Sequence, residues 1–252
     1  MNYEYNIKRL SIILMVAISL TFMMASSCLA ATESENNNID LASIQKQSKI
    51  ISQKVLALVK EGKILEAENL PESKQFQQML SENPALAAEY VFSLECIKAQ
   101  KTNKVNYSIG ENESKIIEFN DGSFIVLSSK TTKTNNSDSI LRDPPGSIYY
   151  ATDDFQSDYY GVYKAAEFHL FTDYEYGLGY VQINTARTTA RSLFPAFMDS
   201  HNGYIDYNRT TSARSRGEFS AHDAAGTFGR TLWTTLTNGA YTVTINHKYQ
   251  NY

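Results

Sequence analysis

Residues 226–252, GTFGRTLWTTLTNGAYTVTINHKYQNY, form the stretch that decides the fold. From Tyr241 onward, apolar or aromatic side chains alternate with polar ones, which is typical of a strand with one buried and one solvated face. Asn238-Gly239 separates this run from the strand before it and supplies the positive φ values that a tight hairpin turn requires. The sequence therefore predicts a closing β-hairpin whose inward row is Tyr241, Val243, Ile245, His247 and Tyr249.

The segment 147–252, which ends in this hairpin, holds 13 of the 17 tyrosines, the single tryptophan and all four histidines. Tyr, Thr, Val and Phe suit a pleated, half-buried surface, and helical spacing is confined to a weak pattern around residues 188–198. Short strands separated by turn residues predict an antiparallel sandwich or barrel. Besides the hairpin, the strand candidates are 147–151, 161–171, 177–185, 204–212 and 217–221.

The segment 39–130 shows helical spacing first and a β-hairpin afterwards. The first helix is expected from Asp40, an N-cap residue, to Gly62, a natural stop. A coiled coil or surface arm is the alternative, which the lack of sustained heptads disfavours. The further elements expected here are helices at 64–69, 72–81 and 84–99 and a hairpin formed by 114–119 and 123–128. Such short amphipathic helices must pack on one another or on a neighbour.

Residues 131–146, TTKTNNSDSILRDPPG, are polar and end in Pro-Pro-Gly, a composition that predicts a linker. A domain boundary is therefore expected between the helical segment and the Tyr-rich β domain. The predicted fold class is α+β: a small N-terminal helical segment with a β-hairpin, then an all-β antiparallel sandwich or barrel.

Residues 1–30 predict a secretory signal peptide. Lys8 and Arg9 precede an uncharged apolar run, and Ala30 fits the small residue before a cleavage site. The polar residues 31–38 are expected to be disordered. The mature chain is thus expected to be exported and to keep no stable transmembrane span after cleavage.

Two alternatives remain open for the start of the chain. The uncharged run from Leu10 to Ala31 is long enough to cross a bilayer, so it could act as an uncleaved anchor. Cys28 could also carry a lipid, although the residues before it are a poor lipoprotein box. Cleavage after Ala30 would leave Cys96 as a single cysteine, which forms no internal disulfide and is either a small core residue or a reactive thiol.

The charge balance disfavours a nucleic-acid partner. Without Glu4, Lys8 and Arg9, the chain keeps 21 basic and 26 acidic side chains. Nucleic acid requires a concentrated basic surface, which this composition lacks.

The histidines are the first place to look for enzymatic chemistry. No HExxH or similar grouping occurs, and no GxSxG nucleophile motif is present. The alternation places His169 on the outward face of its strand and His247 on the inward face. His201 and His222 are expected in turns, each beside an Asp and a Ser, which is the residue set of a hydrolase with a His/carboxylate site. An extracellular hydrolase is therefore kept as an alternative.

Clustered carboxylates offer a second chemistry. The carboxylates that lie among aromatic residues and could take part in glycoside hydrolysis are Asp153, Asp154, Asp158, Asp173 and Glu175. The first three could instead bind a calcium ion. The chain has no D-x-[DN]-x-[DN]-G calcium loop, and Asp is also a common turn residue. We therefore expect neither a metal nor a cofactor.

The Tyr and Arg content is the most informative functional pattern, because Tyr and Arg are enriched and Lys is depleted at recognition surfaces. Tyrosines on both faces of a strand are not expected to be all buried, although Tyr also serves as a core residue. The sequence predicts a secreted, non-enzymatic binding protein that contacts a protein or glycan at the cell surface. A membrane-active secreted protein is a third interpretation. The expected contact residues are Tyr159, Tyr160, Tyr174, Tyr176, Arg214 and Arg216.

Overall fold

The computed structural model describes residues 41–95, 106–134, 147–192, 197–223 and 226–251. The chain divides into one unit up to Ile39 and one compact unit from Asp40 to Tyr252, and all described residues belong to the second unit. The predictions that lie outside the described residues concern the signal peptide 1–30, the segment 31–38, Cys28, Cys96 and most of the linker 131–146.

Four helices follow the amphipathic patterns of the sequence: α2 (Leu41–Lys60), α3 (Ile64–Glu68), α4 (Pro71–Glu82) and α5 (Pro84–Ser93). Helix α2 buries Ile44, Ile51 and Val55 on one face. It ends just before Gly62, whose φ of 75° is a left-handed conformation that glycine adopts without strain. Helix α5 ends at Ser93, and residues 96–99 of the helix expected at 84–99 lie outside the described residues.

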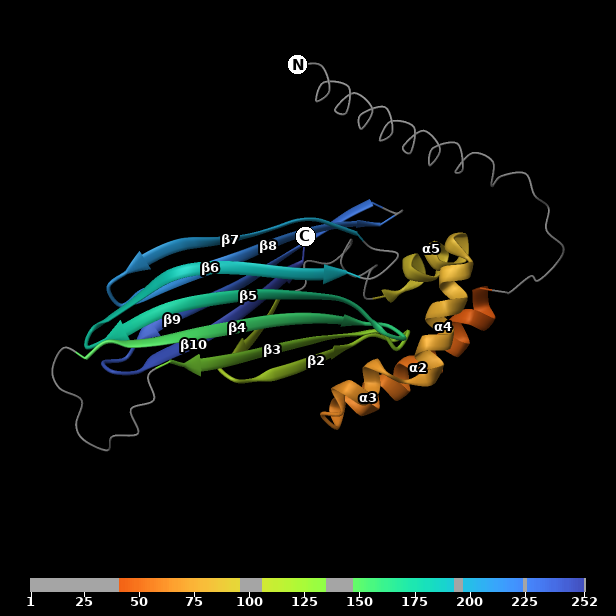
Figure 1. Cartoon of the computed structure of the whole chain (residues 1–252), viewed down its shortest axis with the longest axis horizontal. Helices are drawn as coiled ribbons and strands as arrows, with labels where there is room; N and C mark the ends of the chain where they lie inside the picture. Colours follow the sequence, from red (N-terminus) through yellow and green to blue (C-terminus); the bar gives the residue numbers. More distant parts are fainter. Residues whose placement is uncertain (1–40, 96–105, 135–146, 193–196, 224–225, 252) are drawn as a thin grey trace, which may run out of the picture. The chain divides into compact units, whose positions relative to one another are not determined.

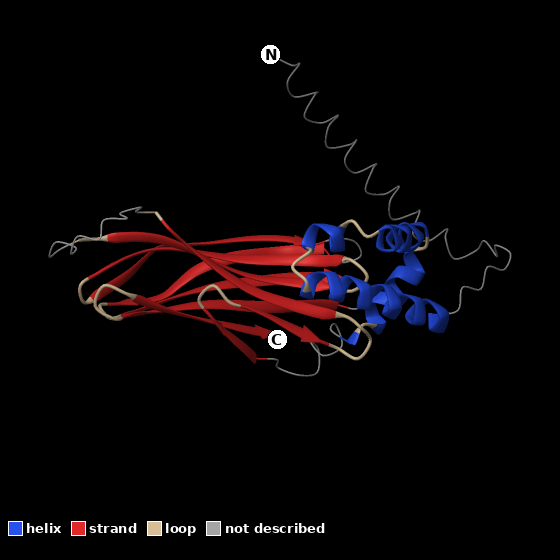
Figure 2. Ribbon diagram, turned by 90° about the horizontal axis from the view of Figure 1, so that it is seen from below, coloured by secondary structure: helices blue, strands red, loops and turns tan. Residues whose placement is uncertain are grey.

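The helices pack on strand residues and share one core with them. Phe124, Tyr160 and Val162 are buried in the same cluster as the apolar faces of the helices. The neighbouring Ile125 and Leu127 belong to a different cluster, on the other side of their strand. The helices therefore cover the sheet only at one end of its strands, where its other face is also buried (Figure 2).

Within the described ranges the β part has ten strands: β1 (Asn106–Gly110), β2 (Ser114–Glu118), β3 (Phe124–Lys133), β4 (Tyr149–Tyr160), β5 (Lys164–Gly177), β6 (Tyr180–Ser192), β7 (Phe197–Arg209), β8 (Ser212–Asp223), β9 (Gly226–Asn238) and β10 (Val243–Asn251). Sheet A has the order β1-β10-β9-β8-β7, and sheet B has the order β2-β3-β4-β5-β6. All pairs are antiparallel. Residues of both sheets meet in one core, so the fold is a sandwich rather than a closed barrel (Figure 1).

The two sheets join strands from both sides of the expected linker. Strand β1 pairs with β10, and β3 pairs with β4 along ten residue pairs from Phe124↔Tyr160 to Lys133↔Ala151. The expected boundary at 131–146 would separate strands that are direct neighbours. Hairpin and linker signals are local, whereas this pairing joins segments that the sequence pattern treats separately.

The closing hairpin is confirmed, with a different turn. Strands β9 and β10 pair as expected, and Ile245, His247 and Tyr249 are buried. The turn spans residues 239–242, and its positive φ, 71°, belongs to Ala240 rather than to the Asn-Gly pair. The neighbour of β10 on its other side is β1, so the last strand lies inside sheet A rather than at its edge.

Several strands are longer than the sequence predicted. Strand β4 continues to Tyr160 because Asp153 and Ser157, both buried, take inward positions where an apolar residue would be expected. The weak helical pattern at 188–198 was wrong, because its described residues belong to β6 and β7. Polar residues on the inner face interrupt the alternation of apolar and polar residues, so a strand predicted from that alternation comes out too short.

The free edges of the two sheets approach each other at β6 and β7. The Asn208 side chain accepts from the Ile183 backbone N–H and donates to the Ile183 carbonyl, both at 2.9 Å. Gly203 lies so close to β6 that a Cβ atom there would be 2.3 Å from the Ala186 carbonyl oxygen. The Asn208 side chain thus forms with Ile183 the two hydrogen bonds that the backbone of a neighbouring strand would form.

Candidate functional site

The four tyrosines expected at a binding surface lie in the core. Tyr159, Tyr160, Tyr174 and Tyr176 expose 2–6% of their surface. The structure therefore corrects the expectation that these side chains form an outer face. Tyrosines on both faces of β4 are buried because the helices cover its outer side, where Tyr160 stacks on Phe124 at 4.8 Å. Tyr159 points between the sheets instead.

Arg214 and Arg216, the other expected contact residues, lie on the outer face of sheet A. Both guanidinium groups contact the carboxylate of Asp206 on β7, with Nε–O distances of 2.9 and 3.0 Å. Arg216 also donates from Nη1 to Glu218 at 2.6 Å. Their positive charges are thus matched by acidic neighbours, which orient the guanidinium groups along the sheet.

A row of aromatic and cationic side chains crosses the same face. Tyr204, Arg216, Trp233 and Lys248 occupy directly opposite positions on β7, β8, β9 and β10. Arg216 lies 4.9 Å from the ring centre of Tyr204, and Lys248 Nζ lies 5.2 Å from that of Trp233, distances typical of cation–π contacts. The sequence did not reveal this row because it depends on the register of four strands.

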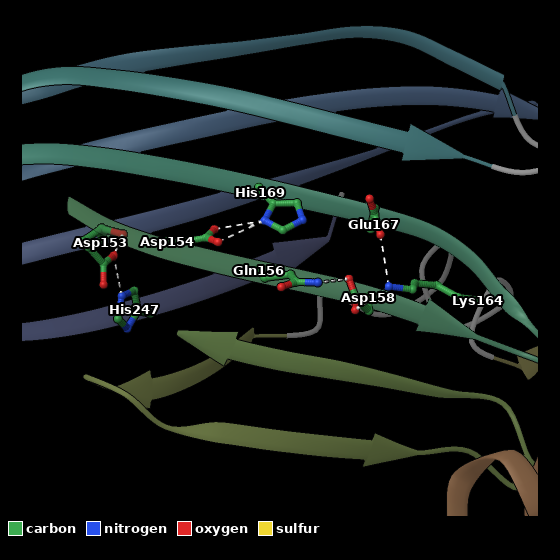
Figure 3. A network of polar contacts seen from close by, with 9 residues as sticks. Asp153, Asp154, Gln156, Asp158, Lys164, Glu167, His169 and His247 are labelled. Carbon is green, nitrogen blue, oxygen red and sulfur yellow. Dashed lines mark hydrogen bonds and ion pairs between the residues drawn. The ribbon is translucent and has the colours of Figure 1, made fainter. Parts of the chain in front are cut away.

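His247 is buried, as the inward row of the last strand predicted, and it binds Asp153 on β4 (Figure 3). Nε2 lies 2.8 Å from Asp153 Oδ2, and Nδ1 lies 3.2 Å from the Gly110 carbonyl oxygen. A carbonyl oxygen only accepts, so Nδ1 is the donor of the bond to Gly110. Asp153 also accepts from Thr131 and Thr234 at 3.2 and 3.1 Å, which satisfies its oxygens inside the sandwich.

His169 lies on the outer face of sheet B, as predicted, and pairs with a carboxylate of the neighbouring strand. Its Nδ1 lies 3.0 Å from Asp154 Oδ1, and its ring stacks on Phe171 at 5.5 Å. Burial opposes the imidazolium charge, but the hydrogen bond and the charge of Asp154 outweigh it and raise the pKa of His169 above 6.5. The pair on this face is therefore an ion pair at mildly acidic pH.

His201 and His222 lie on strands rather than in the two expected turns. His222 Nδ1 contacts the carboxylate of Asp199 across β7 and β8, and His201 Nδ1 lies 3.0 Å from Thr188 Oγ1 on β6. In the described part of the chain, no histidine hydrogen-bonds both a carboxylate and a Ser or Thr hydroxyl. The base–orienter–nucleophile geometry of the hydrolase alternative is not found among these residues.

The aspartates considered as calcium ligands are divided between two faces of β4. Asp153 points inward to His247, whereas Asp154 and Asp158 belong to the outer face with His169 and Lys164 (Figure 3). Within the described ranges, no group of three or more His, Cys, Asp or Glu side chains is arranged to hold a metal ion.

Lys164, at the start of β5, is the centre of a charged cluster where sheet B meets the helices. Its Nζ lies 2.8 Å from Glu68 of α3, 3.1 Å from Glu167 and 3.5 Å from Asp158. Burial raises the pKa of Asp158 above 3.8, although the Lys164 charge opposes this shift. Burial also opposes the charge of Lys164, but the surrounding acids outweigh it and raise the pKa of Lys164 above 10.5. The ammonium group is therefore held in its charged form.

An open cavity of about 240 Å³ adjoins this cluster. Its wall combines residues of two helices with residues of β5, β6 and the β4–β5 connection. The polar and aromatic residues that line it are Glu68, Gln77, Tyr163, Lys164, Glu167 and Arg191. Sequence reasoning missed this site because the helices and the sheet were assigned to separate domains.

The end of the sandwich away from the helices carries three turns that are tied together by Asn238 (Figure 1). Its side-chain amide lies 3.0 Å from the Gly177 carbonyl, 2.9 Å from the Tyr180 carbonyl and 3.2 Å from the Ala240 carbonyl. Its backbone N–H donates to the Thr211 carbonyl at 3.0 Å. One residue thus fixes the β5–β6, β7–β8 and β9–β10 turns relative to one another.

Apolar side chains are exposed at this end. Ile148, Tyr150 and Leu178 expose 43%, 43% and 59% of their surface, and Tyr180 is partly exposed. These four residues are named the turn-end patch. Gly177 leaves room for the Tyr180 ring, because a Cβ atom there would lie 2.7 Å from it. Burial, then the charges of Glu175 and Tyr150, raise the pKa of Tyr180, so its hydroxyl stays neutral in ordinary buffers.

The signal for the turn-end patch was present in the sequence as Gly177-Leu178-Gly179, a leucine in a turn between two glycines. Tyr150 and Tyr180 belong to the Tyr-rich stretch that was expected to form a surface, but they are not the tyrosines that were chosen. Solvent-facing and buried tyrosines in that stretch are distinguished by the strand register and by the covering helices.

No family model matches the sequence, and no curated protein matches it. Among solved structures, the hypothetical protein lmo2686 from Listeria monocytogenes EGD-e is similar over 56% of this chain and 94% of that protein, with 10% sequence identity and a TM-score of 0.25. None of the described helices is both long enough and apolar enough to cross a membrane.

Proposed function

We propose that this chain is an exported, non-enzymatic binding protein that contacts a protein partner through the turn-end patch. The observation that carries the proposal is the exposure of Leu178, on a turn that Asn238 holds, together with that of Ile148 just before β4 and Tyr150 on β4. Exposed apolar residues that gather at one place on a folded surface are typical of interaction sites. Tyr supplies contact area at low entropic cost, which suits such a site.

The rigidity of the turns supports binding rather than simple exposure. Loops that a sandwich holds in place bind without the cost of ordering them first. The Asn238 hydrogen bonds and the packing of Tyr180 on Gly177 fix the backbone beneath the patch. The partner surface expected for these side chains is apolar, with room for one tyrosine ring.

The proposal is tested with a photo-crosslinking amino acid placed at Leu178 and, as the control, at Leu65, which is exposed on a helix. The full chain is incubated with intact cells of the source organism. We expect a discrete protein adduct from position 178 only. Excess unlabelled wild type should remove it, whereas the double variant Tyr150→Ser/Leu178→Ser should not.

A matched control is the double variant Leu65→Ser/Ile205→Ser, which removes two apolar side chains of similar exposure elsewhere. In excess, this control variant should remove the adduct at position 178 as effectively as unlabelled wild type. Equal adducts at both positions, no adduct at all, or an adduct of two copies of this chain would overturn the proposal. Liposome binding that the Tyr150→Ser/Leu178→Ser variant abolishes would assign the patch to a lipid surface instead.

A further inference from the structure

The cavity beside Lys164 has the size and chemistry of a site for a small polar ligand. Its volume of about 240 Å³ lies below the range of about 300–1,000 Å³ that is usual for drug-sized ligands. Its wall includes the polar or charged side chains of Glu68, Gln77, Lys164, Glu167 and Arg191. A ligand that fits must therefore be small and must offer charged or hydrogen-bonding groups.

One side of the cavity has an excess of carboxylates. Glu68 and Glu167 each contact Lys164 through one oxygen, Oε1 at 2.8 Å and Oε2 at 3.1 Å. Asp158 is the third carboxylate around this single ammonium group. The side chains of Glu68 and Glu167 keep exposed fractions of 32% and 27%, so their second oxygens can accept from a further donor. This side favours a ligand with an ammonium group.

Arg191 is the second positively charged residue of the cavity wall, besides Lys164. It stands directly opposite Glu167 in the β5–β6 register and is exposed. Among the described residues it has no ion pair, in contrast to Arg187 on the same strand, which binds Asp173. A guanidinium group binds a carboxylate through two parallel N–H donors. The Arg191 guanidinium group is thus available to bind a ligand carboxylate, next to a wall that is rich in carboxylates.

We propose that this cavity binds a small zwitterion, with the ligand ammonium group at Glu68 and Glu167 and the ligand carboxylate at Arg191. The chemical class is a free α-amino acid or the equivalent end groups of a very short peptide. Gln77 and Tyr163 also line the cavity. Burial raises the pKa of Tyr163 to about 12, so its hydroxyl keeps its proton at neutral pH. The site is separate from the turn-end patch, at the other end of the sandwich.

The test uses isothermal titration of the full chain with L-alanine and L-glutamine as zwitterions. Alaninamide, which keeps only the ammonium group, and N-acetylalanine, which keeps only the carboxylate, are the single-charge probes. We expect saturable binding of at least one zwitterion and at least tenfold weaker binding of both single-charge probes. Absence of saturable binding, or equal binding of a single-charge probe, would overturn the proposal.

Single substitutions test which residue binds the ligand carboxylate and which binds the ligand ammonium group. Arg191→Gln and Glu167→Gln should each weaken the zwitterion at least tenfold, whereas Arg187→Gln, on the outer face of the same strand, should leave it unchanged. Thermal unfolding of each variant shows whether the fold is retained. Binding that survives Arg191→Gln in a folded protein contradicts the assignment.

Discussion

Nε2 of His247 lies 2.8 Å from Oδ2 of Asp153, and this contact joins sheet A to the central strand of sheet B inside the core. Both side chains are fully buried. Buried pairs of this kind need not add stability over apolar packing, but the loss of one member leaves the other without its partner in a medium of low dielectric. The contact therefore makes the two sheets dependent on each other.

Asp153→Ala is expected to lower the free energy of unfolding by about 3–5 kcal/mol, because it leaves the buried His247 without its acceptor. Asp154→Ala, at the next position on the partly exposed outer face, is the matched control and should cost about 1 kcal/mol or less. Urea unfolding followed by tyrosine and tryptophan fluorescence measures both. Equal losses in the two variants would contradict a special role for the inner pair.

The Asp154–His169 pair predicts a pH-dependent contribution to stability. The pKa of His169 is raised in the folded state, so the contribution is fully present below about pH 6.5 and is lost as the pH rises through the raised folded value. His169→Phe should therefore cost more stability at pH 5.5 than at pH 8.5. His201→Phe, which removes a histidine bonded to a threonine hydroxyl, should not reproduce that difference. An equal cost of His169→Phe at both pH values would refute the prediction.

Asn238→Asp replaces the amide donor with an oxygen that faces three carbonyl groups. We expect a loss of about 2–3 kcal/mol, since the carbonyls lose their donor and meet a like partial charge. Amide hydrogen exchange should become faster at Val181, whose N–H donates to the Thr210 carbonyl at 3.0 Å. Asn246→Asp, on the exposed face of β10, is the control. Unchanged exchange at the turns would show that Asn238 does not hold them.

Gly203→Ala tests the close approach of β6 and β7. The added methyl group would lie 2.3 Å from the Ala186 carbonyl oxygen, so one strand must move. Overpacking of this kind costs about 1–3 kcal/mol. Ser200→Ala on the same strand adds no bulk and should stay within about 0.5 kcal/mol of the wild type. Similar stabilities of the two variants would mean that the edges separate easily.

The sequence predicted local features well because their causes are local. The helix stop at Gly62 and the inward row of His247 and Tyr249 follow from backbone freedom and from the two-residue period of a strand. The extent of β4 was underestimated, because Asp153 and Ser157 face inward, and Asp153 is hydrogen-bonded by Thr234 and His247 of distant strands. A polar residue with a long-range partner looks like a turn residue when only its neighbours are known.

The candidate sites were less predictable because they depend on which surfaces are covered. Tyr160 and Tyr150 have similar sequence surroundings, yet the helices bury the first and leave the second exposed. The Lys164 cavity needs α3 and β5 side by side, which no local pattern indicates. Arg214 and Arg216 were correctly expected at the surface, but their pairing with Asp206 depends on the β7–β8 register.

The pairing of β1 with β10 has a consequence for how the chain reaches its fold. The contact between Gly110 and His247 spans 137 residues, and strand β10 is the neighbour of both β1 and β9. During synthesis, β1 must wait for its partner until residues 243–251 have emerged, and such non-local pairing slows folding. A product that stops before Val243 would leave two open strand edges, which invite aggregation. Residues 243–251 are therefore required for a complete sheet A, because β10 lies between β1 and β9.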